Sequence, residues 1–131
     1  MQYAQRTQDK ALKAIAMDMI DWSFDIGWDS KEHGGGILYF LDSEGRNPPY
    51  LEWHMKLWWP HNEAMIAFAM LYKETKDIKH WQKFVQVCEY ALAHFSDATN
   101  HGEWFGYCDR DGTVTHRFKV SYIITSHHIT L

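Results

Sequence analysis

The sequence predicts an all-α fold, namely part of an α/α toroid whose short β-hairpin loops gather on one rim. Two observations lead to this prediction. Helices with one apolar face alternate with a helix that is apolar almost all round, as expected where outer helices enclose inner ones. The chain also contains an internal repeat of helices and a glycine-rich loop. Because two repeats cannot close a ring, we expect the chain to be a fragment of a larger barrel, or to have its edges covered by something else.

The first predicted helix runs from about residue 8 to residue 22. Thr7 or Asp9 is available to cap it, because such side chains accept a hydrogen bond from an unpaired backbone N–H of the first turn. The apolar residues recur at the spacing of one helical face, which indicates an amphipathic helix. They are Leu12, Ile15, Ala16, Met19 and Trp22.

A glycine-rich loop follows from Gly27. Residues 33–36 read His-Gly-Gly-Gly, residues 37–41 form a short β-prone run, and residues 42–45 have the Asp-x-x-Gly pattern of a turn. This order is typical of a β-hairpin. Two prolines at residues 48 and 49 then block an immediate helix, and residues 50–57 are expected to be extended.

Residues 56–64, Lys-Leu-Trp-Trp-Pro-His-Asn-Glu-Ala, open the most apolar helix of the chain. Proline has a fixed φ and no N–H, so this helix is predicted from Pro60 to about residue 73, buried almost all round. His61 and Glu63 fall in its first turn, beside Trp58 and Trp59. Unpaired N–H groups and the helix dipole there suit a carboxylate, a polar ligand or a neutral histidine acting as a base. The pattern predicts a pocket with its chemistry at the rim.

The last predicted helix follows a charged linker at residues 73–77 and ends near residue 95, with one apolar face. The loop after it matches the first loop at a constant offset of 67 residues, since Gly35 corresponds to Gly102, Asp42 to Asp109 and Gly45 to Gly112. This is the internal repeat. Trp104 and Phe105 are expected at the tip of the second loop, where they could touch a substrate.

Composition excludes several classes of function. The net charge of −4 offers no basic surface for nucleic acid. The polar N-terminus is not a signal peptide and no apolar run reaches transmembrane length, so a cytoplasmic protein without membrane contact is expected. Cys88 and Cys108 are expected to be free thiols. No metal site is expected, because neither His33 nor His101 has a second ligand at zinc spacing.

Residues 56–64, together with Gly-Glu-Trp-Phe-Gly-Tyr at residues 102–107, resemble the N-acylglucosamine 2-epimerase family, also called the renin-binding proteins. The resemblance covers residues 1–119 and leaves residues 120–131 as a divergent tail. It implies an (α/α)6 barrel that interconverts N-acetylglucosamine and N-acetylmannosamine, with ATP as an activating nucleotide and a homodimer as the assembly.

Epimerisation next to an aldehyde requires removal of a C–H proton on one face and return of a proton on the other, so two bases must flank the carbon. We expect His61 to be one base and Glu63 to orient its imidazole or to bond a sugar hydroxyl. Trp58 and Trp59 would form an apolar wall, with Trp104 and Phe105 as further substrate contacts. The family's second catalytic histidine stands in a segment that is not found after Lys119, and neither His127 nor His128 is assigned that role. The isolated chain is therefore expected to be inactive.

Other interpretations remain open. A mannose isomerase or a cellobiose epimerase would share the toroid and the histidine chemistry. A non-catalytic protein that binds renin is the alternative from a different class. Asp29 with Glu32, or Asp109 with Asp111, would be the carboxylate pair of a glycosidase, but turn chemistry explains the Asp-x-x-Gly pattern more simply.

Overall fold

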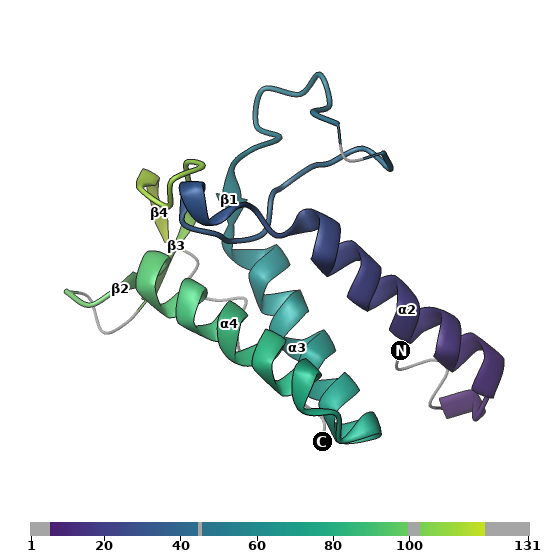
Figure 1. The fold of residues 1–131 in the computed structure, drawn as a ribbon. Helices are drawn as coiled ribbons and strands as arrows, with labels where there is room; N and C mark the ends of the chain where they lie inside the picture. The colour runs from purple at the N-terminus through teal and green to yellow at the C-terminus, as the bar shows by residue number, and fades with distance from the viewer. Residues whose placement is uncertain (1–5, 45, 100–102, 120–131) are drawn as a thin grey trace.

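The computed structural model describes residues 6–44, 46–99 and 103–119 of the 131-residue chain (Figure 1). Its main elements are three long helices, α2 (Lys10–Gly27), α3 (Trp58–Thr75) and α4 (Ile78–His94), and one 3-10 turn, η1 (Lys31–His33). α3 packs against both α2 and α4. Figure 1 shows the strands and loops gathered at one end of the helices, where α2 and α4 finish and α3 begins.

Helix α2 is capped as predicted, because the Asp9 carboxylate accepts a hydrogen bond from the Leu12 N–H at 3.0 Å. It continues five residues beyond the predicted end. The apolar face predicted for this helix is largely exposed in the structure, since Ile15, Met19 and Trp22 are 55%, 61% and 54% exposed. The helix carries apolar residues on a second side, and it is this side that packs on α3 through Phe24, Met17 and Ile20.

Helix α3 begins at Trp58, two residues before the predicted start, and ends at Thr75. His61 therefore lies in the first turn as predicted, but Glu63 lies in the second turn, where the prediction was wrong. The prediction that it is buried all round is wrong for this chain. Only His61, Phe68 and Leu71 are buried, because α2 and α4 cover just part of the helix. Its remaining apolar side chains are half-buried or exposed.

The helices carry a small antiparallel sheet, so the all-α prediction is confirmed only as a helix-rich fold. The strands are β1 (Lys56–Leu57), β2 (Ser96–Asp97), β3 (Glu103–Cys108) and β4 (Val114–Lys119). β3 pairs with each of the other three. Through β1, where Lys56 lies opposite Cys108, the entrance of α3 is attached to the second hairpin. Of the expected extended segment 50–57, only residues 56–57 form a strand.

The two predicted turns of the internal repeat share one pattern of hydrogen bonds. The N–H of Asp42 donates to the carbonyl of Arg46 at 3.2 Å, and the N–H of Asp109 donates to that of Thr113 at 2.8 Å. Oδ1 of each aspartate also accepts from the backbone N–H groups two and four residues later, at 2.9 and 2.8 Å in the first turn and at 3.0 and 2.8 Å in the second. Every partner keeps the offset of 67 residues, so the two turns are of one kind. Within the described part of the first loop, the predicted strands of the first hairpin are not formed, because Ile37 and Leu38 make only isolated bridges, to Trp28 and Lys56.

The core consists of two adjoining clusters. One lies between the helices and contains Phe24, Phe68, Leu71 and Val87. The other lies under the sheet and contains Tyr90, Ala91, Phe95 and Cys108. Trp28 and Met65 pack against both clusters, which joins helices and sheet in one fold. Within the described ranges, no helix is long and apolar enough to cross a membrane.

Candidate functional site at the entrance of α3

His61 is fully buried in the first turn of α3, and both of its ring nitrogens have partners. Nδ1 lies 2.7 Å from the carbonyl oxygen of Leu57, to which it donates, and Nε2 accepts from the N–H of Ile37 at 2.9 Å. Burial lowers the pKa of this imidazole from 6.5 to about 4, and the nearby charge of Lys56 acts in the same direction. The histidine is therefore neutral, but neither nitrogen is open to a substrate. This geometry does not support the predicted base, and that role stays untested.

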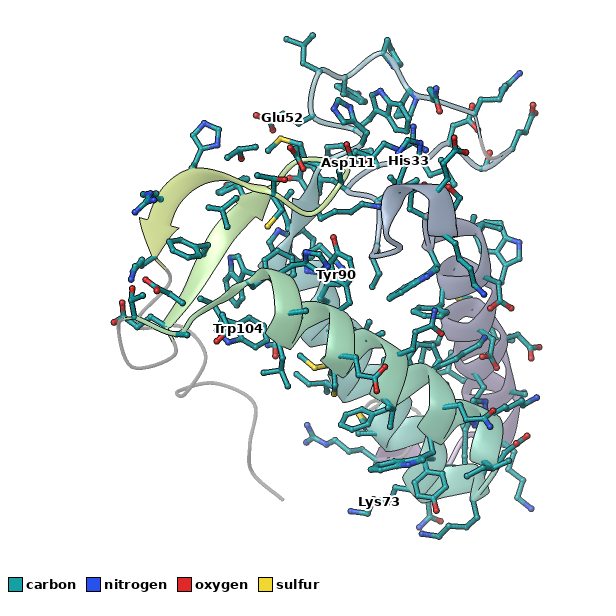
Figure 2. All side chains as sticks on the ribbon, turned by 60° about the vertical axis from the view of Figure 1, so that its left-hand side comes forward. His33, Glu52, Lys73, Tyr90, Trp104 and Asp111 are labelled. Atoms are coloured by element: carbon teal, nitrogen blue, oxygen red, sulfur yellow. The ribbon has the colours of Figure 1, made fainter. Side chains whose placement is uncertain are left out.

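Three rings stack beside the helix entrance. The ring centroids of His61 and Tyr90 are 4.9 Å apart, with an angle of 13° between the ring planes. The ring centroids of Tyr90 and His94 are 4.2 Å apart, with an angle of 28° between the planes. His94 donates from Nδ1 to the carbonyl of Gly112 at 3.0 Å, so it holds the second hairpin turn as His61 holds the first loop. Figure 2 shows Tyr90 between α4 and the sheet. Its buried hydroxyl has no hydrogen-bond partner among the residues that the structure describes, and burial raises its pKa.

A buried ion cluster joins the two hairpin loops. Nζ of Lys56 lies 2.7 Å from Oδ2 of Asp29, and Arg110 donates to both oxygens of the same carboxylate at 2.9 Å. Burial alone would raise the pKa of Asp29, but the hydrogen bonds from Arg110 and Lys56 lower it well below its usual value. Sequence reasoning missed this cluster, although a lysine within an aromatic string was a visible sign of it.

A second contact between the loops joins His33 and Asp111, whose Nδ1 and Oδ1 are 3.0 Å apart (Figure 2). Asp29 lies in the ion cluster and Asp109 shapes its turn, which explains these carboxylates without glycosidase chemistry. Across the described part of the chain, no group of three or more potential ligands could hold a metal ion. His101 lies outside the described residues.

Glu63 is two residues from His61 but faces solvent. Because each residue turns the helix by about 100°, residues two positions apart point to nearly opposite sides. Both nitrogens of His61 have other partners, so Glu63 does not orient the imidazole. Trp59 is 46% exposed, with its ring edge-on to Tyr39 at 6.2 Å, whereas Trp58 packs against the core under the sheet. Glu63 and Trp59 are thus the accessible members of the predicted set.

Trp104 and Phe105 lie within β3, so the prediction that they sit at a loop tip is wrong. The tip of this hairpin is formed by residues 109–113. Trp104 packs against Phe95 with ring centroids 6.1 Å apart, and the ammonium of Lys119 lies 5.2 Å from the ring centre of Phe105. Alternation along the strand directs these two neighbours to opposite faces. Their predicted contact with a substrate stays untested.

Comparison with known proteins gives consistent results. A family model described as N-acylglucosamine 2-epimerase (GlcNAc 2-epimerase) matches residues 1–127. Enzymes named N-acylglucosamine 2-epimerase from Bos taurus and Homo sapiens are 48% and 43% identical over 91% of the chain. These matches cover 28% and 27% of the two enzymes, so the chain spans little more than a quarter of their length. A solved structure of D-mannose isomerase is similar over 76% of this chain, with 26% sequence identity and a TM-score of 0.65. The match covers 24% of the isomerase chain.

Proposed function

The chain belongs to the N-acylglucosamine 2-epimerase family, and we propose that, within a polypeptide of the length of its relatives, it serves to interconvert N-acetylglucosamine and N-acetylmannosamine. The observation that carries this proposal is the 43–48% identity to four mammalian enzymes of that name. The family expected from residues 56–64 and 102–107 is thereby confirmed.

The proposed reaction inverts C2 of the open-chain sugar. One group removes the C2 proton, which the neighbouring aldehyde makes acidic, and a proton then returns to the opposite face. At the entrance of α3, Glu63 offers an accessible carboxylate and Trp59 an exposed aromatic face. We assign Glu63 to contact with the reacting part of the sugar and Trp59 to packing on its ring.

We also propose that α2, α3 and α4 are successive outer, inner and outer helices of an (α/α)6 toroid. The similarity to D-mannose isomerase supports this arrangement. The exposed apolar side of α2 supports it too, because Leu12, Ile15, Met19 and Trp22 recur at helical spacing without cover from the described elements. In this proposal, further helices of the full-length protein cover that side.

A related alternative is an aldose–ketose isomerase. D-mannose isomerase from Marinomonas mediterranea is 27% identical over 71% of the chain, beside the structural match. Such an enzyme would remove the same C2 proton but return it to C1, so the product distinguishes the two reactions. The higher identity to the epimerases favours epimerisation. ATP activation, a homodimer and binding of renin are further proposals that rest on the family resemblance.

The test is turnover of N-acetylmannosamine and of D-mannose by a polypeptide that carries this chain at the length of its relatives, with and without ATP. We expect N-acetylglucosamine as the product, with deuterium at C2 when the reaction runs in heavy water. Glu63→Gln is expected to lower kcat about 100-fold or more. Glu89→Gln, at an exposed position on α4, is the matched control and should leave kcat unchanged. Conversion of D-mannose alone, to its ketose, would contradict the proposal.

A further inference from the structure

The two hydrogen bonds of His61 connect segments that are far apart in the sequence. Leu57 precedes the histidine by one helical turn, whereas Ile37 belongs to the first hairpin loop, 24 residues earlier. The neighbouring carbonyl of Gly36 accepts from the N–H of Asp29 at 2.8 Å and lies 3.3 Å from Nζ of Lys56. The histidine therefore fastens the first loop to the helix entrance at the same place as the buried ion cluster.

The partners determine which ring nitrogen carries the proton. The N–H of Ile37 can only donate, so Nε2 must be the unprotonated acceptor. The carbonyl of Leu57 can only accept, so Nδ1 must carry the hydrogen. One neutral tautomer satisfies both contacts. A second proton on Nε2 would point at the N–H of Ile37 and would break the link to the loop.

The surroundings of the ring leave no route for a sugar. Tyr90 stacks on the imidazole, and Phe95 meets it at 66° with a centroid distance of 5.0 Å. The side chain is 0% exposed. A general base must come within hydrogen-bond distance of the proton that it removes, directly or through one water. His61 does not meet this requirement in the described arrangement.

We propose that His61 is a positioning residue, which fixes the first hairpin loop to the entrance of α3 and exchanges no proton with the sugar. It acts through the backbone of Leu57 and Ile37 and so sets the place of Trp59 and Glu63 relative to the loop. Only the measurement of kcat rests on the proposed function. The tautomer of His61 and its contacts are properties of the fold and do not depend on that function.

The decisive variant is His61→Gln, because the glutamine amide offers an NH2 donor group and a carbonyl acceptor but cannot act as an acid or a base at neutral pH. In the full-length polypeptide, we expect His61→Gln to keep kcat within about fivefold and to keep the shape of its pH profile. His61→Leu removes both hydrogen bonds and should lower the melting temperature and kcat together. Glu63→Gln is the comparison that loses kcat without losing stability. A loss of about 100-fold in kcat for a stably folded His61→Gln variant would overturn the proposal.

A second measurement is independent of any activity. Nitrogen-15 NMR of the unaltered chain should show His61 with a protonated Nδ1 and a bare Nε2, without change between pH 8 and pH 6. A proton on Nε2, or titration of the ring within that range, would overturn the positioning role. If the full-length protein converts neither sugar, the proposed function fails, and the NMR result still decides the role of His61.

Discussion

At the scale of single residues, the buried imidazole of His61 makes stability depend on pH. Its pKa is about 4 in the folded chain against 6.5 for an ordinary histidine, mainly because of burial. Between these values the unfolded chain binds a proton that the folded chain does not, so unfolding becomes more favourable as the pH falls. The contribution of the neutral imidazole to the free energy of unfolding is complete above pH 6.5 and is lost as the pH falls towards 4. This contribution amounts to roughly 3 kcal/mol.

We expect this loss in the free energy of unfolding between pH 7.5 and pH 4.5, measured by urea titration. His61→Gln removes the titrating group, so the variant should lose less stability over the same range by about 2 to 3 kcal/mol. Equal losses in the two proteins would show that the imidazole is not the source of the pH dependence.

Asp29 is a second residue whose effect can be predicted. Asp29→Asn leaves the buried ammonium of Lys56 without its counter-charge, and breaking a buried pair in this way typically costs about 3 to 5 kcal/mol. The double variant Asp29→Asn, Lys56→Met should recover part of that loss, because no uncompensated charge remains in the buried pair. Thermal and urea unfolding would measure both.

The control is the half-exposed pair between Lys13 and Glu74. Lys13→Met should change the free energy of unfolding by less than about 1 kcal/mol. If Asp29→Asn costs no more than this control, the ion cluster does not stabilise the fold.

At the scale of elements, two glycines hold the loops against the ring stack. Gly36 has φ +86°, and a Cβ there would lie 2.4 Å from Cζ of Tyr90. Gly112 has φ +84°, and its Cβ would lie 2.4 Å from Nδ1 of His94. Alanine at either position is expected to cost more than about 2 kcal/mol, from backbone strain and from displacement of a buried ring.

Gly27 provides the matched control in the same loop region. The nearest atom to its Cβ would be a methyl carbon of Ile37 at 4.0 Å, and the residue ends helix α2. Gly27→Ala should therefore change the free energy of unfolding by less than about 1 kcal/mol in either direction. Similar losses at all three positions would contradict the close approach at Gly36 and Gly112.

The elements themselves were largely predictable from local chemistry. The Asp9 cap, the proline in the first turn of α3 and the Asp-x-x-Gly turns each depend on neighbouring residues only. The packing side of α2 was not predictable, because the helix is apolar on two sides and the sequence does not say which one meets α3. The strand position of Trp104 was missed for a similar reason, since a short aromatic run fits a loop tip as well as a strand.

At the scale of the whole molecule, the exposed side of α2 distinguishes the isolated chain from the proposed toroid. Met19→Gln should change the stability of the isolated chain by less than about 0.5 kcal/mol, because the side chain is exposed. In the full-length protein the same substitution should cost about 2 kcal/mol or more, because a covering helix would bury it. Met17→Gln, on the side that packs in the core, should destabilise both proteins. Equal tolerance of Met19→Gln in both would contradict the toroid.

Residues 56–64 and 102–107 together were sufficient to identify the family, but not to assign a role to each residue of the first string. Lys56, Trp58 and His61 turn inward and hold the fold, while Trp59 and Glu63 remain accessible. The identity of His61 suggested proton transfer, and its partners became visible only once the first loop was placed beside the helix. Lys56 meets Asp29 across 27 residues of sequence, a pairing that no local pattern specifies.

The matching turns at Asp42 and Asp109 mean that each repeat contains the residues that form its own turn. A copied gene segment that encodes one such unit would bring along the bend that returns the chain to the ring. Duplication of such a unit would lengthen the protein by whole units, and ionic contacts such as that between Asp29 and Arg110 would join neighbouring units.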